Sequence, residues 1–286
     1  MDKRIWCFWE PASAMPGYLR ACLRTIELSA GAPVHLLTAR EVAELAPDMK
    51  PWLVSYIPSV AQRTDYYRSH LLLAQGGVWL DIDVVVLDDL TFLFDMAEQH
   101  DLVARVLPGH VSVSLLASRP GSPAIAEWIG RQEEILTSGD SNRLEWSALG
   151  SSSLTPAAAS RDVHAVPTTR VAPIPWRQSD LFLSRHLGPS SILQNRPATV
   201  LLYNARFPPW LRTASEREIL DSPIMLSRLL RIALGESAAE DEERATDRFL
   251  RPLERGASLL TMTASRLRRG ADVVIGRRKG ASQHVT

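Results

Sequence analysis

QRTDYYRSHLLLAQGGVWLDIDVVVLDDL, residues 62–90, is the stretch that decides the fold. Its first half continues a helical pattern that we expect from about Ser59 to Gln75, and Gly76-Gly77 ends that helix. Apolar residues then dominate from Val78 to Leu87, as a buried central strand requires. The stretch therefore predicts a helix, a glycine turn and one buried strand in direct succession.

The segments before this stretch alternate between strand and helix signals. Ile5 to Trp9 and Val34 to Leu37 are short apolar or aromatic runs typical of strands. Pro16 to about Ser29 has helical spacing and is closed by Gly31, and Thr38-Ala-Arg-Glu41 is a capping box that opens a short helix. This β-α-β-α order predicts an α/β fold with a largely parallel sheet flanked by helices.

The patterns after the central stretch are weaker. We expect strands at 101–106 and 111–117, a helix from Pro123 to Leu136 and a last strand from Val200 to Asn204, with loops and short helices over 137–198. No internal repeat is visible. We therefore expect one domain over residues 1–235, followed by a charged, basic tail over 236–286 that is helical or disordered.

The composition narrows the class of protein and its compartment. Lys plus Arg and Asp plus Glu both number 32 among 286 residues, so the basic excess typical of nucleic-acid binders is missing. Cys7 and Cys22 are too few for a disulfide framework or a metal cluster. No apolar run approaches the ~20 residues that span a bilayer, and the first residues do not form a secretion signal. We expect a cytoplasmic protein.

The C-terminal tail offers one further interaction. RLRRGADVVIGRRKG, residues 266–280, is basic around the apolar run 273–275, and such a segment could lie on anionic lipid. The alternative is a solvated or disordered tail. The first interpretation would place the protein peripherally at the inner face of the cell membrane.

Asp81 and Asp83 are the first candidates for chemistry. If both lie in one strand, they point to the same face and their carboxylates converge. Crowded carboxylates need a cation or a proton, and Mg²⁺ or Mn²⁺ with phosphates suits such ligands. A chain of this composition holds roughly one Asp-x-Asp by chance, in a turn or at a solvated edge. The apolar run around this pair argues for the metal site, because burying unpaired charge is costly.

Asp65, Arg68 and Trp9 are candidates for holding a nucleotide. Asp65 and Arg68 lie three residues apart on one helix face, either as an ordinary surface ion pair or as a grip on a ribose and a phosphate. The Gly76-Gly77 turn leads their helix directly to the aspartates. Trp9 follows the first strand, where ligands bind in α/β sheets, so it could stack on a base or simply pack in the core. Trp6 points to the other face and should be a core residue.

The quoted stretch resembles the core of the capsular polysaccharide synthesis and family 32 sugar transferases, which are related to the Och1-type yeast mannosyltransferases and the clostridial glucosylating toxins. The shared pattern is an Asp-x-x-Arg helix, a Gly-Gly turn, an aromatic residue and Asp-x-Asp, with 16 residues from Asp65 to Asp81. RIWCFWEP, residues 4–11, is similar to the opening strand of that family. SSSLTP (151–156) and LLYNARFPPW (201–210) match more loosely.

The resemblance implies a GT-A fold, a nucleotide-sugar donor and Mn²⁺ or Mg²⁺. Carried over by position, Trp9 stacks on the base, and Asp65 and Arg68 hold the ribose and sugar side of the donor. Asp81 contacts the ribose and a metal-bound water, and Asp83 binds the metal. Asn204 is a further candidate ligand near the end of the domain, although Tyr203 replaces the usual His or Trp and the expected Ser after the Asn is absent.

The resemblance further implies a retaining transferase, with a UDP-sugar as the favoured donor and a glycan or lipid-linked saccharide as acceptor in bacterial surface polysaccharide synthesis. Two alternatives remain: a non-catalytic relative that binds nucleotide sugars or glycans, and a metal-dependent phosphohydrolase. The phosphohydrolase usually needs more carboxylates or histidines than this pattern offers. Turnover separates the transferase from the binding relative.

Overall fold

The computed structural model describes residues 2–138 and 144–236. The chain divides into two units, Met1–Ser184 with Pro189–Ala238, and Arg185–Gly188 with Ala239–Thr286. All helices and strands described below lie in the first unit. Nearly all of the predicted tail, including the basic segment 266–280, falls outside the described residues.

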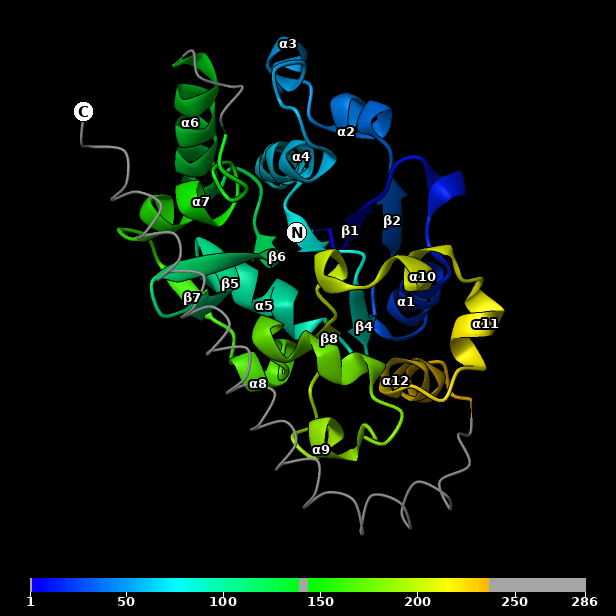
Figure 1. Ribbon diagram of the computed structural model, residues 1–286. Coiled ribbons are helices and arrows are strands. Elements are labelled where there is room, and N and C mark those ends of the chain that lie inside the picture. Colours follow the sequence, from blue (N-terminus) through cyan, green and yellow to red (C-terminus); the bar gives the residue numbers. More distant parts are fainter. Residues whose placement is uncertain (1, 139–143, 237–286) are drawn as a thin grey trace, which may run out of the picture. The chain divides into compact units, whose positions relative to one another are not determined.

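A six-stranded sheet runs through this unit in the order β2-β1-β3-β6-β5-β7 (Figure 1). Its strands are β1 (Ile5–Phe8), β2 (Val34–Leu37), β3 (Gly77–Leu80), β5 (Leu102–Leu107), β6 (His110–Ser118) and β7 (Val163–Ala165). β1 runs parallel to β2 and β3, and β5 runs parallel to β7, whereas β6 is antiparallel to both of its neighbours. The predicted mixed, mostly parallel sheet flanked by helices is therefore confirmed, with β7 as a strand that the sequence did not indicate.

The helices before β3 follow the local signals closely. They are α1 (Gly17–Ser29), α2 (Ala39–Leu45), α3 (Pro51–Val54) and α4 (Val60–Gln75), with the short η1 (Ala12–Ala14) ahead of them. The capping box of α2 is present, with Thr38 and Glu41 in reciprocal hydrogen bonds. Gly76 ends α4 at a φ of 62°, a left-handed conformation that favours glycine. The predictions of α1, α2 and α4 are confirmed, because each rests on residues adjacent in sequence, whereas η1 and α3 were not predicted.

The prediction of one strand from Val78 to Leu87 is wrong. β3 ends at Leu80, and β4 (Val84–Val86) pairs instead with β8 (Thr199–Leu201) in a separate antiparallel sheet. The residues between, 81–83, form a turn. Two carboxylates inside a fully buried strand would be uncompensated charges, whereas at the turn both aspartates are half-buried. Asp81 and Asp83 therefore do not share one face of a strand.

The remaining elements are mostly short. They are α5 (Phe92–Gln99), α6 (Pro123–Thr137), α7 (Ser151–Ala158), α8 (Thr168–Val171), η3 (Trp176–Leu183), α9 (Ser190–Leu193), η4 (Asn204–Arg206), α10 (Pro209–Thr213), α11 (Glu216–Leu220) and α12 (Met225–Ala233). The predicted last strand ends at Leu201, and Asn204 lies beyond it in η4. The described helices include none long and apolar enough to cross a membrane.

The main core lies between the sheet and the helices α2, α4 and α6, which lie on one side of it, whereas α1 and α12 lie on the other (Figure 1). Trp6, Trp79 and Trp128 are its largest side chains, each almost fully buried. Trp6 is thus the core residue that its strand face predicted. Cys7 and Cys22 are buried free thiols. This packing fixes the carboxyl ends of β1 and β3 beside α4.

Candidate active site

Arg68 joins α4 to the carboxyl end of β3. Its side chain is only 5% exposed, and its Nη2 lies 3.3 Å from Asp65 Oδ1 and 3.1 Å from Asp81 Oδ1. Its Nη1 donates a hydrogen bond to the carbonyl oxygen of Val113 on β6. The pair of Asp65 and Arg68 is therefore not an ordinary surface ion pair, but a buried link between the helix and the first aspartate of Asp-x-Asp.

Trp79 also orients Asp81. The Trp79 Nε1 donates to Asp81 Oδ1 at 2.9 Å, and the Arg68 guanidinium lies 5.0 Å from the Trp79 ring centroid. The backbone N–H of Asp81 donates to the Ser114 carbonyl oxygen at 2.9 Å. The sequence pattern included this aromatic residue but gave it no role. Its position two residues before Asp81 was the available signal, because alternate residues of a strand share a face.

Asp83 is held by the segment that follows β8. The backbone N–H of Asn204 donates to Asp83 Oδ2 at 2.7 Å, and the N–H of Leu202 donates to the Asp83 carbonyl oxygen at 2.9 Å. The Tyr18 hydroxyl on α1 donates to Asn204 Oδ1. The structure thus brings Asn204 beside Asp83 as expected. The contact is made by the backbone N–H of Asn204 and not by its side chain. That Asn204 ligates a metal remains a prediction.

Asp65, Asp81 and Asp83 lie close together, and among the described residues Arg68 forms ion pairs with Asp65 and Asp81. Burial raises the pKa of Asp65 to about 7, with Arg68 opposing the rise and Asp81 adding to it. Burial, followed by the charge of Asp81, raises the pKa of Asp83 to about 6. Burial also raises the pKa of Asp81 against the opposing charge of Arg68. The site therefore favours binding of a cation, which would relieve the repulsion between these acids.

The carboxylate oxygens of Asp81 and Asp83 that accept no hydrogen bond from the described residues could bind a divalent metal whose remaining ligands are water or phosphate. Asp81 Oδ2 and Asp83 Oδ1 accept no hydrogen bond from another of the described residues. Within residues 2–138 and 144–236, no group of three His, Cys, Asp or Glu side chains is arranged to hold a metal. Two carboxylates with water and phosphate oxygens are a set that Mg²⁺ or Mn²⁺ commonly accepts.

Gly150, immediately before α7, is a site residue that the sequence did not reveal. A Cβ atom built on it would lie 2.7 Å from Asp65 Oδ2. The backbone at this point therefore forms the wall against which the Asp65 carboxylate rests. In the sequence, Gly150 is marked only by its place before SSSLTP. Nothing around this glycine indicates that it contacts Asp65.

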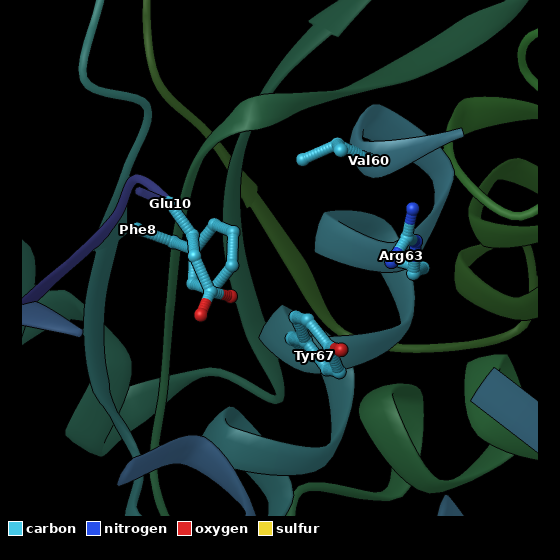
Figure 2. Close-up of a pocket in the computed structure, with 5 residues that line it drawn as sticks. All are labelled: Phe8, Glu10, Val60, Arg63 and Tyr67. Atoms are coloured by element: carbon cyan, nitrogen blue, oxygen red, sulfur yellow. The ribbon is translucent and has the colours of Figure 1, made fainter. Parts of the chain in front are cut away.

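Trp9 lies at the carboxyl end of β1, where the sequence placed it. It is half-buried, and its Nε1 is a buried donor with no partner among the described residues. A pocket opens nearby, between the end of β1 and α4 (Figure 2). Its lining residues are Phe8, Glu10, Val60, Arg63 and Tyr67. Stacking of Trp9 on a base remains a prediction.

Comparison with known proteins finds one family model that matches part of the chain. Residues 14–103 match the family model described as a glycosyltransferase sugar-binding region containing a DXD motif. This range includes Asp65, Arg68, Asp81 and Asp83. No protein with a curated function matches the sequence.

Several solved structures are distantly similar. The galactosyltransferase LgtC, solved with donor and acceptor sugar analogs, is 16% identical with a TM-score of 0.47, over 85% of this chain and 99% of that one. The PaToxG glycosyltransferase is 15% identical with a TM-score of 0.41, over 83% and 87%. GlyE from Streptococcus pneumoniae TIGR4 is 12% identical with a TM-score of 0.39, over 59% and 46%. Similarity at this level says nothing about substrate.

Proposed function

We propose that the chain is a glycosyltransferase that takes its sugar from a nucleotide-sugar donor, uses Mn²⁺ or Mg²⁺ and retains the anomeric configuration of the sugar. The acceptor is a glycan or lipid-linked saccharide of bacterial surface polysaccharide synthesis. The observation that carries the proposal is Arg68, buried between Asp65 and Asp81 beside the aspartate that Asn204 holds.

Each side chain of this cluster has a proposed role. Asp83 and Asp81 hold the divalent metal through their free carboxylate oxygens, with Asn204 as a further ligand. Asp65 and Arg68 hold the ribose and sugar side of the donor, and Asp81 adds a contact to the ribose. Trp9 stacks on the base. Asp81, Asp83 and Arg68 are thus the catalytic group.

The charges that develop in the reaction explain why these groups are needed. Cleavage of the sugar–phosphate bond leaves negative charge on the diphosphate; a metal held by Asp83 and Asp81 would stabilise that charge as a Lewis acid. Arg68 is held by Asp65, Asp81 and the Val113 carbonyl, so it adds a fixed positive charge that need not reorganise during the reaction.

The stereochemical proposal rests on the family resemblance, which implies retention of the anomeric configuration. We propose that the acceptor hydroxyl attacks on the face from which the diphosphate departs, and that a donor phosphate oxygen takes its proton. A UDP-sugar is the donor that the family resemblance favours. We propose that the sugar transfer takes place in the cytoplasm and that the C-terminal tail contacts the inner face of the cell membrane peripherally.

Released nucleotide measures the reaction directly. The protein is incubated with Mn²⁺ and a panel of UDP-, GDP- and CMP-sugars, alone and with saccharide acceptors. Asp83→Asn should abolish release, whereas Asp221→Asn on the exposed end of α11 should not. Nucleotide binding without any turnover would support the non-catalytic relative instead. Clean inversion of the product anomer would contradict same-face attack.

A further inference from the structure

Arg105 is a buried cation that no acid neutralises. It lies on β5, is 6% exposed and forms no ion pair with any of the described residues. Its Nη2 donates to Ser112 Oγ at 3.1 Å, and its Nη1 makes a long contact of 3.3 Å with the Tyr203 hydroxyl. A buried guanidinium is costly unless a negative charge balances it. Arg105 therefore differs from Arg68, which two aspartates hold.

Most of the hydrogen-bonding capacity of this guanidinium is unused. Arginine has five N–H donors in a planar fork, and the two contacts of Arg105 occupy one N–H on each terminal nitrogen. The Arg105 Nε is a buried donor with no partner among the described residues. The Tyr203 hydroxyl is itself engaged, because it donates to the Ile174 carbonyl oxygen at 2.9 Å. The remaining N–H groups of Arg105 match the paired oxygens of a carboxylate or a phosphate.

The backbone around this side chain is irregular at two points. The pairing of β5 with β6 shifts register between Ala104 and Val106, so Arg105 lies where the ladder is interrupted. Such interruptions redirect a side chain and are common beside active sites. Tyr203 has a φ of 61°, a left-handed conformation that is rare for a bulky residue and gathers at ligand sites. Both features are typical of a binding site more than of simple packing.

Hydrogen bonds connect Arg105 to the first aspartate of the Asp-x-Asp turn. Its partner Ser112 has its Oγ 3.0 Å from Ser114 Oγ. The carbonyl oxygen of Ser114 accepts from the backbone N–H of Asp81 at 2.9 Å. The Ser114 residue is half-buried, as is Asp81, so both border the same accessible part of the molecule.

A second connection leads from Arg105 to the other aspartate. Tyr203 directly precedes Asn204, whose backbone N–H donates to Asp83 Oδ2 at 2.7 Å. Tyr203 and Asp83 are both half-buried. Arg105 thus lies one residue behind the site on two sides, and a molecule that reaches the aspartates can also reach its guanidinium.

The distance from β3 indicates which substrate meets Arg105. β5 is the second strand from β3 in the order β3-β6-β5, and neighbouring strands lie about 4.8 Å apart. Arg105 is therefore about 10 Å across the sheet from β3, at whose end the proposed function places the metal and the diphosphate. A ligand group at this distance belongs to the molecule that receives the sugar.

We propose that Arg105, with the hydroxyl of Ser114, forms a subsite for an anionic group of the acceptor; this rests on the proposed function. The acceptor is then an acidic saccharide that carries a carboxylate, as in a uronic acid, or a phosphate. The guanidinium donates to the anionic oxygens and determines specificity without taking part in bond cleavage. A charge-assisted contact of this kind is worth roughly ten- to a hundredfold in affinity.

Matched acceptors test this assignment on the full chain, with Mn²⁺ and the nucleotide sugar that releases most nucleotide. Methyl glycosides of glucose, galactose and mannose are each supplied with a hydroxymethyl group, a carboxylate or a phosphate ester at the same ring carbon. The variants are Arg105→Met, Arg105→Lys and Ser114→Ala, and the control is Arg217→Met, exposed on α11. Calorimetry with UDP and GDP measures nucleotide binding, and thermal unfolding reports on folding.

In the unchanged protein, kcat/KM with an acidic form should exceed that with its neutral counterpart at least about tenfold. The better of the two acids identifies carboxylate or phosphate as the group. Arg105→Met should bring the ratio near one and leave nucleotide binding unchanged, whereas Arg105→Lys should keep part of the preference because the charge remains. Arg217→Met should leave the ratio unchanged.

Transfer to no acidic form, or a ratio that Arg105→Met does not move, would overturn the subsite, while nucleotide release leaves the transferase proposal intact. Loss of UDP and GDP binding in Arg105→Met would place the guanidinium on the diphosphate and would also overturn it. If Arg105→Met does not fold, Ser114→Ala decides: the ratio should fall severalfold, and an unchanged ratio counts against the subsite. Absence of nucleotide release from every donor would overturn the transferase proposal as well.

Discussion

Replacing Gly150 with alanine should disturb the site without touching any charged residue. The added Cβ would lie 2.7 Å from Asp65 Oδ2, whereas ordinary contact begins at 3.4 Å, so the carboxylate must retreat by about 0.7 Å. Its other oxygen now lies 3.3 Å from Arg68 Nη2. A displacement of that size would disturb this contact, because the same carboxylate makes both.

Two magnitudes follow from this displacement. Overpacking of a well-packed site typically lowers the free energy of unfolding by about 1–3 kcal/mol. Misplacement of a binding group by about 1 Å can cost a hundredfold in rate, so kcat/KM should fall roughly ten- to a hundredfold. Urea unfolding measures the first effect, and donor turnover with Mn²⁺ measures the second.

Gly130→Ala is the matched control. Gly130 lies within α6, and a Cβ atom built there meets nothing within 4 Å. The same substitution should therefore raise the free energy of unfolding by about 0.5–1 kcal/mol through helix propensity, with turnover unchanged. If Gly150→Ala behaves like Gly130→Ala in both assays, the position of the Asp65 carboxylate does not depend on Gly150, and the prediction is refuted.

Further predictions concern the charges of the site and one buried histidine. Asp83→Asn should remove the stabilisation of the protein by nucleotide with Mn²⁺ in thermal shift and lower kcat by at least about a hundredfold, because the metal loses its direct ligand; a retained shift would count against this role. Arg68→Lys should lower the free energy of unfolding by about 3 kcal/mol in urea, because one ammonium cannot replace the guanidinium between Asp65 and Asp81; an unchanged midpoint would refute the buried link. His70 is 5% exposed, and burial lowers its pKa from 6.5 to about 4. The unfolded chain therefore binds the proton first, so stability should fall as the pH drops from 6.5 to 4, by up to about 3 kcal/mol. His70→Gln should remove this part of the pH dependence in unfolding measured at pH 7, 5.5 and 4, and an identical slope in both proteins would contradict it.

Residues close together in sequence determined much of the fold. The capping box at Thr38, the helical pattern of α4 and its end at Gly76-Gly77 were all visible as local patterns, and each forms as predicted. Asp65 and Arg68 could be placed on one helix face for the same reason. Local hydrogen bonds and side-chain periodicity are set within a few residues, so the sequence contains them directly.

The break at Asp81 shows where local pattern was insufficient. The apolar run from Val78 to Leu87 looks continuous, yet β3 pairs with β1 and β6 whereas β4 pairs with β8. Which partner a strand finds depends on segments up to about a hundred residues away. Burial of charge then decides where the run divides, because the turn at 81–83 leaves both aspartate side chains half-buried instead of enclosed in a continuous strand.

By itself the sequence determined that an acid and an arginine on one helix precede two aspartates, and that these residue types suit a metal and a nucleotide. Only the tertiary structure decided that one guanidinium joins Asp65 to Asp81, that the Asn204 backbone holds Asp83 and that Gly150 confines Asp65. The physical reason is distance along the chain: Asn204 lies 121 residues from Asp83. Contacts of that kind exist only once the sheet and its helices have packed.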